Sequence, residues 1–165
     1  MNQDELRRLF EWDAWANHAA LESIRTATDG AGGAANAAAL PRALRIAAHL
    51  FGAGRLWLDR LHGDPPSMDV WPVLSIDQCA ESFGELDRAW SAYLGKLSDA
   101  ELRRRVAYVN SKGERWENMV RDVLIQVTHH GCYHRGQIAL LVRDSGASPA
   151  YTDYIEAVRR GVLQG

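Results

Sequence analysis

Apolar side chains recur every three or four residues along most of the chain, which is the spacing of one face of an α-helix. Four long segments carry this pattern, at residues 4–28, 41–62, 76–97 and 117–144, and a shorter one follows at 152–162. Four long helices joined by short connections are typical of a four-helix bundle, in which functional sites form between facing helices. The pattern therefore predicts an all-α protein built as a four-helix bundle with a short C-terminal helix.

Helix-breaking and helix-capping residues mark the ends of these segments. The glycines within 30–33 favour a turn after the first helix, and Pro41 suits the first turn of the second, where its missing N–H costs nothing. The Gly-Asp-Pro-Pro run at 63–66 ends the second helix. Ser75 and Gln78 have the spacing of a capping box, so the third helix is expected to start there.

The helical period is interrupted between the third and fourth long segments. Residues 106–109, Val-Ala-Tyr-Val, and residues 114–116, Glu-Arg-Trp, flank the turn-prone sequence Asn-Ser-Lys-Gly at 110–113. Two short runs of this kind around a turn predict a β-hairpin. We therefore expect a small β-hairpin insertion before the last long helix.

Composition narrows the class of protein. The 165 residues are 47% hydrophobic and 24% charged, as in ordinary globular proteins, and this length predicts a single domain over residues 1–165. A net charge of −2 leaves no basic surface for a nucleic-acid backbone. Two cysteines cannot build a disulfide framework, and no apolar stretch approaches the ~20 residues of a membrane span. The start lacks a signal peptide, so a soluble, cytoplasmic protein is expected.

Three of the six histidines fall on helix faces predicted to point into the bundle. His49 lies on the second helix, and His130 and His134 stack one turn apart on the fourth. Two imidazoles at this spacing can reach one metal ion, as in H-E-x-x-H sites, although the glutamate that serves as base in those proteases is absent here. His18 and His62 are weaker candidates.

The alternative for each histidine is a core residue satisfied by a backbone carbonyl. A lone inward histidine is usually of this kind. Burying several imidazoles is costly, because each unpaired ring nitrogen costs roughly 1–3 kcal/mol. Three inward histidines on two helices therefore favour metal ligands over core residues. His129 points about 100° away from His130 and is either exposed or a partner of a ligand.

Several stretches of the chain resemble the DinB/YfiT-like family of metal-binding four-helix bundles. The run from His130 to Ile138, His-Gly-Cys-Tyr-His-Arg-Gly-Gln-Ile, is similar to that family's H-x-x-x-H-R-G-Q signature and is the most specific part. Supporting likenesses lie around His49 (followed by Leu-Phe-Gly-Ala), in Trp-Ala-Asn at 15–17 and in 149–155. The resemblance covers about residues 4–160.

This resemblance implies a divalent metal bound by His49, His130 and His134 in a homodimer. Surplus apolar residues such as Trp12, Trp15 and Val142 are a second reason to expect a dimer. Relatives include thiol-dependent S-transferases. The leading hypothesis is a metal-dependent enzyme that acts on a small molecule. It is either an S-transferase that uses a low-molecular-weight thiol or a hydrolase. The alternatives are a non-catalytic metal-binding stress-response protein and an interaction module without metal.

Three neutral imidazoles leave a tetrahedral metal with an open position, where bound water or thiol loses its proton near neutral pH. The expected cofactor is one divalent transition metal, zinc or nickel ahead of iron or manganese. Nearby polar residues have open roles. Asn17 either hydrogen-bonds a ligand imidazole or a substrate, or is a satisfied polar residue at a helix crossing. Asp153 either orients an imidazole or, more simply, is an acid at a helix N-terminus. Arg135 is either a surface ion-pair partner or an anion-binding residue, and Gln137, which follows His134 on the same helix, has no assigned role. A mid-helix glycine at 136 suggests close helix approach.

Overall fold

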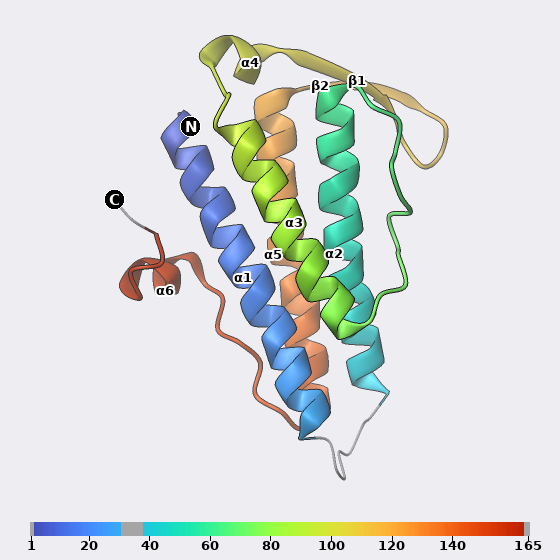
Figure 1. The fold of residues 1–165 in the computed structure, drawn as a ribbon, viewed down its shortest axis with the longest axis vertical. Helices are drawn as coiled ribbons and strands as arrows, with labels where there is room; N and C mark the ends of the chain where they lie inside the picture. Colours follow the sequence, from blue (N-terminus) through green and yellow to red (C-terminus); the bar gives the residue numbers. More distant parts are fainter. Residues whose placement is uncertain (1, 31–37, 164–165) are drawn as a thin grey trace.

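The computed structural model describes residues 2–30 and 38–163, and within them four long helices form a bundle (Figure 1). The long helices are α1 (Gln3–Asp29), α2 (Ala39–His62), α3 (Ile76–Leu94) and α5 (Val120–Asp144). Capping boxes start α1 at Asn2 and α3 at Ser75, the second of which the sequence predicts. The predicted turn at Gly32 and Gly33 lies outside the described residues.

A short helix and a hairpin lie across one end of the bundle. Helix α4 (Asp99–Arg103) leads into β1 (Arg105–Val109), which pairs antiparallel with β2 (Arg115–Met119). The predicted β-hairpin is therefore confirmed. Its second strand extends further than expected, so α5 begins at Val120 rather than near 117. The last helix, α6 (Tyr154–Arg159), is also shorter than the expected 152–162.

The connection between α2 and α3 is not short, and on this point the sequence-based expectation was wrong. Residues 63–75 run back along the bundle from the hairpin end, so α2 and α3 point in the same direction (Figure 1). Gly63, in the left-handed conformation at φ 80°, ends α2 and turns the chain into this segment. A crossover of this kind still gives a four-helix bundle, but it places a long strip of irregular chain beside α2.

Apolar residues fill the bundle along its whole length. One buried cluster near the 30–38 end includes Ile24, Phe83 and Ile138, and a second near the hairpin includes Leu6, Leu58 and Leu124. No helix in the described part of the chain is both long and apolar enough to cross a lipid bilayer.

Two of the residues taken as surplus apolar surface are in fact buried within this chain. Val142 is fully buried in the core, and Trp12 is 7% exposed beneath the C-terminal segment, where its indole N–H donates to the Thr152 carbonyl. Trp12 belongs to a small buried cluster that includes Ala157 of α6, and Trp15 is partly buried against this cluster. These three residues therefore give no reason to expect a dimer.

Candidate metal centre

The three inward-facing histidines meet between α2 and α5. One ring nitrogen from each of His49, His130 and His134 lies within 4.8 Å of the others. The Nε2 atoms of His49 and His130 are 3.1 Å apart, and the ring centroids are separated by 4.4 to 5.1 Å. The structure thus brings together the three residues that the sequence singled out as metal ligands.

The crossover segment orients the first of these rings. The Nδ1–H of His49 donates to the Val70 carbonyl at 2.9 Å, and the indole of Trp71 stacks on the imidazole at 3.8 Å with an interplanar angle of 13°. Gly52, one turn along α2, makes this approach possible. A Cβ there would lie 2.8 Å from the Val70 carbonyl oxygen and 2.9 Å from Cδ of Pro72, closer than real Cβ contacts.

A side chain orients the third ring. The Nδ1–H of His134 donates to Oε1 of Gln137, one turn further along α5, at 2.9 Å. Histidine metal ligands commonly donate one ring N–H to a carbonyl or carboxylate, which leaves the other nitrogen free to bind. His49 and His134 are both held in this way, with Nε2 as the remaining nitrogen. Gln137, whose role the sequence left open, is thereby placed as a partner of a candidate ligand.

Burial favours the neutral form of two of the three rings. Desolvation lowers the pKa of His49, and it lowers the pKa of His130 to about 4, with the neighbouring imidazoles adding to the effect. At pH 7 both rings are therefore uncharged and have a nitrogen lone pair available. A metal ion needs its histidine ligands in this neutral form.

The spacing suits a transition metal. Metal–nitrogen bonds of about 2.0–2.1 Å at tetrahedral angles place two ligand nitrogens about 3.3 Å apart. The 3.1 Å between the His49 and His130 Nε2 atoms is close to this value. Without a metal, two lone pairs cannot face each other at that distance, so His130 must donate its Nε2–H to His49. The residues present therefore fit a metal site with three histidine ligands.

A buried ion pair that the sequence did not reveal lies beside the triad. Nη1 of Arg135 donates to Oδ1 of Asp13 at 2.5 Å and to Oδ1 of Asn17 at 2.6 Å, and Nδ2 of Asn17 donates to Oδ2 of Asp13 at 3.0 Å. Of the two alternatives for Arg135, the ion pair is present, but it is buried and not at the surface, because the Arg135 side chain is only 2% exposed. Asn17 is a satisfied polar residue where α1 crosses α5. The guanidinium also lies over the Trp12 ring at 4.8 Å.

The glycine that permits close helix packing is not the one the sequence suggested. A Cβ at Gly136 would meet no atom of the described structure within 4 Å, whereas one at Gly131 would overlap the Asp13 carboxylate. Gly131 thus allows α1 and the buried ion pair to approach α5. The H-x-x-x-H-R-G-Q motif gave no signal for Gly131, because this residue occupies an unspecified position of the motif.

The other candidates lie outside the triad. His18 pairs with Asp87 at 2.8 Å. His62, the last residue of α2, packs against Tyr93 of α3. The exposed His129 donates from Nδ1 to the Ile125 carbonyl, so it does not orient a ligand. Asp153 is the N-terminal cap residue of α6, which agrees with the simpler of its two predicted roles.

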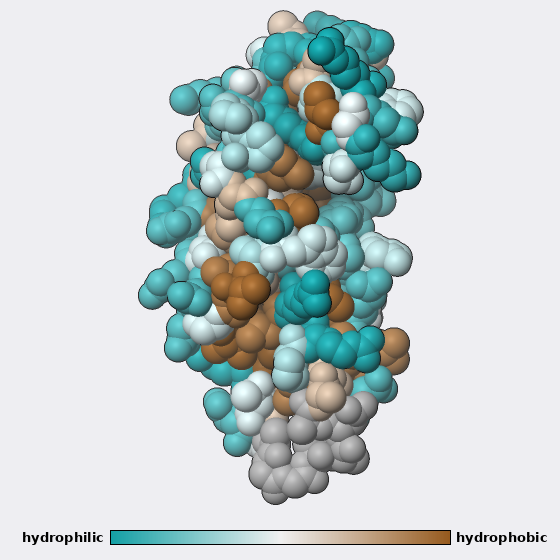
Figure 2. All heavy atoms as spheres, turned by 90° about the vertical axis from the view of Figure 1, so that its right-hand side faces the viewer, coloured by the Kyte–Doolittle hydropathy of each residue, from teal (hydrophilic) through white to brown (hydrophobic). Residues whose placement is uncertain are grey.

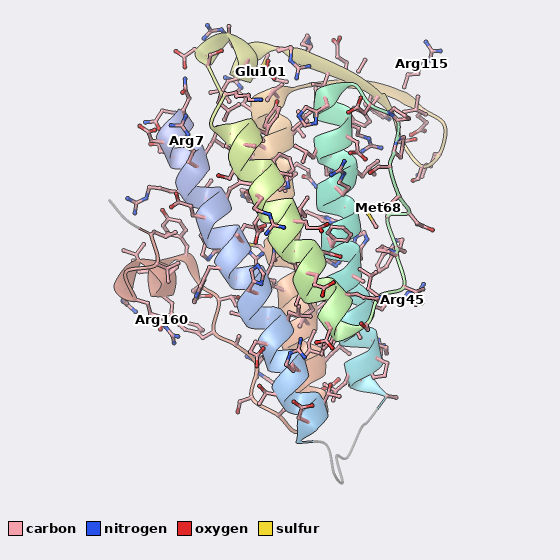
Figure 3. The ribbon with its side chains drawn as sticks, in the orientation of Figure 1. Arg7, Arg45, Met68, Glu101, Arg115 and Arg160 are labelled. Carbon is pink, nitrogen blue, oxygen red and sulfur yellow. The ribbon has the colours of Figure 1, made fainter. Side chains whose placement is uncertain are left out.

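The crossover segment forms part of one outer face of the molecule. Figure 2 views this face and shows hydrophobic residues gathered in its lower half among hydrophilic ones. Val73 is 98% exposed and Trp71 is 41% exposed, so the indole that stacks on His49 also reaches the surface. The guanidinium of Arg45 lies 5.6 Å over the outer side of this indole, and Figure 3 places Arg45 beside the segment.

Comparison with known proteins identifies relatives of this chain. A family model described as "DinB family" matches residues 1–160. Protein DinB from Bacillus subtilis (strain 168) is 20% identical over 156 residues, which is 89% of this chain and 90% of that protein. No match was found among solved structures.

Proposed function

The chain belongs to the DinB family, and on this premise we propose that it binds one divalent transition-metal ion through His49, His130 and His134 and acts as a metal-dependent transferase or hydrolase. The observation that carries the proposal is the triad itself, in which three imidazoles converge from two helices. Two of the rings are held with Nε2 inward by Val70 and Gln137. Zinc or nickel is the expected metal, ahead of iron or manganese.

An all-histidine set favours catalysis over a purely structural role. Structural zinc sites are closed and usually contain cysteine, and neither cysteine belongs to the triad. Three protein ligands leave a coordination position for a water molecule or thiol, whose pKa the metal lowers towards or below neutral pH. Among the described residues, Val70 and Gln137 orient two of the ligands. We therefore favour transfer of a thiol to a small electrophile, or hydrolysis, as the reaction. The cytoplasm is the compartment in which we expect it.

Metal analysis of point variants tests the site. Each of His49→Ala, His130→Ala and His134→Ala should abolish most binding of Zn²⁺ or Ni²⁺ in competition with a chromophoric chelator, because each leaves only two ligands. His129→Ala is the matched control, since it removes an adjacent imidazole that does not point into the cluster. The proposal is contradicted if the wild-type protein contains no metal after metal-supplemented expression. It is also contradicted if His129→Ala loses as much metal binding as the triad variants do.

Turnover separates catalysis from metal storage. Metal-loaded protein should accelerate transfer of a small thiol to an aryl halide, or hydrolysis of an activated ester, and His130→Ala should lose this rate while keeping the helical circular-dichroism spectrum. Metal binding without turnover on either class of substrate would favour a non-catalytic metal-binding stress-response protein.

The oligomeric state is part of the proposal. We expect a homodimer, as the DinB/YfiT resemblance implies, and light scattering at micromolar concentration should give twice the 18.4 kDa chain mass. A mass equal to that of one chain would contradict the proposed dimer, whereas the proposed metal site would not be affected by this result.

A further inference from the structure

A cavity inside the hairpin-proximal half of the bundle adjoins the metal site described above and has not yet been assigned a role. It has a volume of about 350 Å³ and is bordered by all four long helices. Its walls are mainly apolar and aromatic, with Phe10, Trp57 and Trp90 the largest side chains and Leu86, Leu94 and Val127 between them. Protein cores are normally packed without voids larger than a water molecule, so an opening of this size is a feature to be explained.

One member of the triad closes the end of this cavity. His130 and Gly131 line it from α5, at the same level as Asn17 of α1, while Arg7 and Leu94 border the opposite end. Arg7 donates to the Leu94 carbonyl across the gap between α1 and α3, near the α1 end marked in Figure 3. A molecule that filled the cavity would therefore contact the ring of a candidate metal ligand.

The charges around the cavity argue against an ionic occupant. Asp13 is paired with Arg135, Asp87 is paired with His18, and Arg7 is paired with Asp4. Glu11 and Ser91 are exposed and lie at the mouth between α1 and α3. The deep walls thus offer rings and methyl groups, because Asp13, Asp87 and Arg7 have ion-pair partners and Glu11 lies at the exposed mouth.

We infer that this cavity binds a neutral small molecule with an apolar body of two or three rings, or of similar bulk, placed against His130. The size follows from comparison with an apolar cavity of about 150 Å³, which accepts one benzene ring. That this molecule is the acceptor substrate rests on the proposed function. The preference for a neutral ring compound rests on the cavity alone.

Two dyes with one aromatic skeleton test the inference. N-phenyl-1-naphthylamine is neutral, and 8-anilino-1-naphthalenesulfonate adds a sulfonate to the same rings. Titrated into the full chain with fluorescence detection, the neutral dye should bind at least 10-fold more tightly. Equal affinity, or tighter binding of the sulfonate, would overturn the assignment to a neutral ligand.

Two substitutions locate the dye. Ala14→Phe places a ring inside the cavity from α1, and Ser91→Trp covers its mouth from the exposed side of α3. Each should weaken the neutral dye at least 10-fold with the helical circular-dichroism spectrum retained. Ala92→Phe, an exposed neighbour outside the cavity, is the matched control and should bind as wild type does. Unchanged binding in Ser91→Trp and Ala14→Phe would overturn the cavity as the site.

A third measurement tests contact with His130. In protein loaded with Co²⁺, saturation with the neutral dye should shift the visible absorption bands of the metal, and absence of a shift would overturn the contact. The dye titrations are also run without metal. If the protein binds the dye but takes up no metal, the cavity assignment is supported and the proposed function is contradicted. If the protein takes up metal but does not bind the dye, the cavity assignment is contradicted and the proposed metal site is supported.

Discussion

Loss of the buried ion pair between Asp13 and Arg135 should destabilise the fold far more than loss of an ion pair at the surface. The Arg135 side chain is 2% exposed and that of Asp13 is 11% exposed, so solvent cannot replace the lost partner. In Asp13→Asn the guanidinium stays buried beside a neutral amide. Breaking a buried pair by removing one charge costs about 3–5 kcal/mol. Because asparagine keeps an acceptor oxygen, we expect the lower end, about 3 kcal/mol.

Urea unfolding of metal-free protein at pH 7, followed by circular dichroism, measures this loss. Thermal unfolding should show a fall of roughly 6–12 °C, at about 2–4 °C per kcal/mol for a chain of this size. Glu156→Gln is the matched control. It removes an i,i+4 pair with Arg160, whose side chain is 59% exposed, and should cost under ~1 kcal/mol. A loss in Asp13→Asn no larger than in this control would refute the reasoning.

The double substitution Asp13→Leu with Arg135→Met separates the charge from the packing. Replacing both members of a buried pair by apolar residues of similar volume is often neutral or stabilising. We therefore expect the double variant to be more stable than Asp13→Asn. If it is equally unstable, the loss comes from packing at the α1–α5 contact and not from an unpaired buried charge.

Three further predictions concern two helix contacts and one titration. Gly131→Ala should destabilise by about 1–3 kcal/mol because its Cβ would overlap the Asp13 carboxylate, whereas Gly136→Ala, with open space around it, should stabilise by up to about 1 kcal/mol; equal signs in urea unfolding would contradict this. Gly52→Ala should displace the crossover segment that orients the first histidine and weaken metal binding 10–100-fold in chelator competition, with Gly136→Ala as control. The hydrogen bond to Asp87 raises the pKa of His18 above its ordinary 6.5, so its stabilising contribution is complete below pH 6.5 and is lost as pH rises through the raised value. In an NMR titration Asp87→Asn should lower this pKa, because burial of the ring then acts without the opposing hydrogen bond and charge of Asp87, and an unchanged pKa would be the contrary result.

The sequence by itself determined the four long helices, the hairpin and the identity of the candidate ligands, whereas it did not indicate the short helix α4. The helices, the hairpin and the capping box at Ser75 follow from hydrophobic period and local hydrogen bonding, which neighbouring residues specify. His130 and His134 must share a face at i,i+4, and the apolar stripe of α2 turns His49 inward. These are local relations, and the structure brings the three rings together as they predict.

The tertiary structure alone decided what holds and surrounds these rings. The acceptor for His49 is a backbone carbonyl, which any residue at position 70 would supply, so no side-chain pattern marks it. Arg135 finds its carboxylate 122 residues away, and the same guanidinium at the surface would look identical in sequence. The cavity depends on how four helices pack against one another. Such long-range contacts leave no periodic signal, because they form only when separate elements meet in the folded bundle.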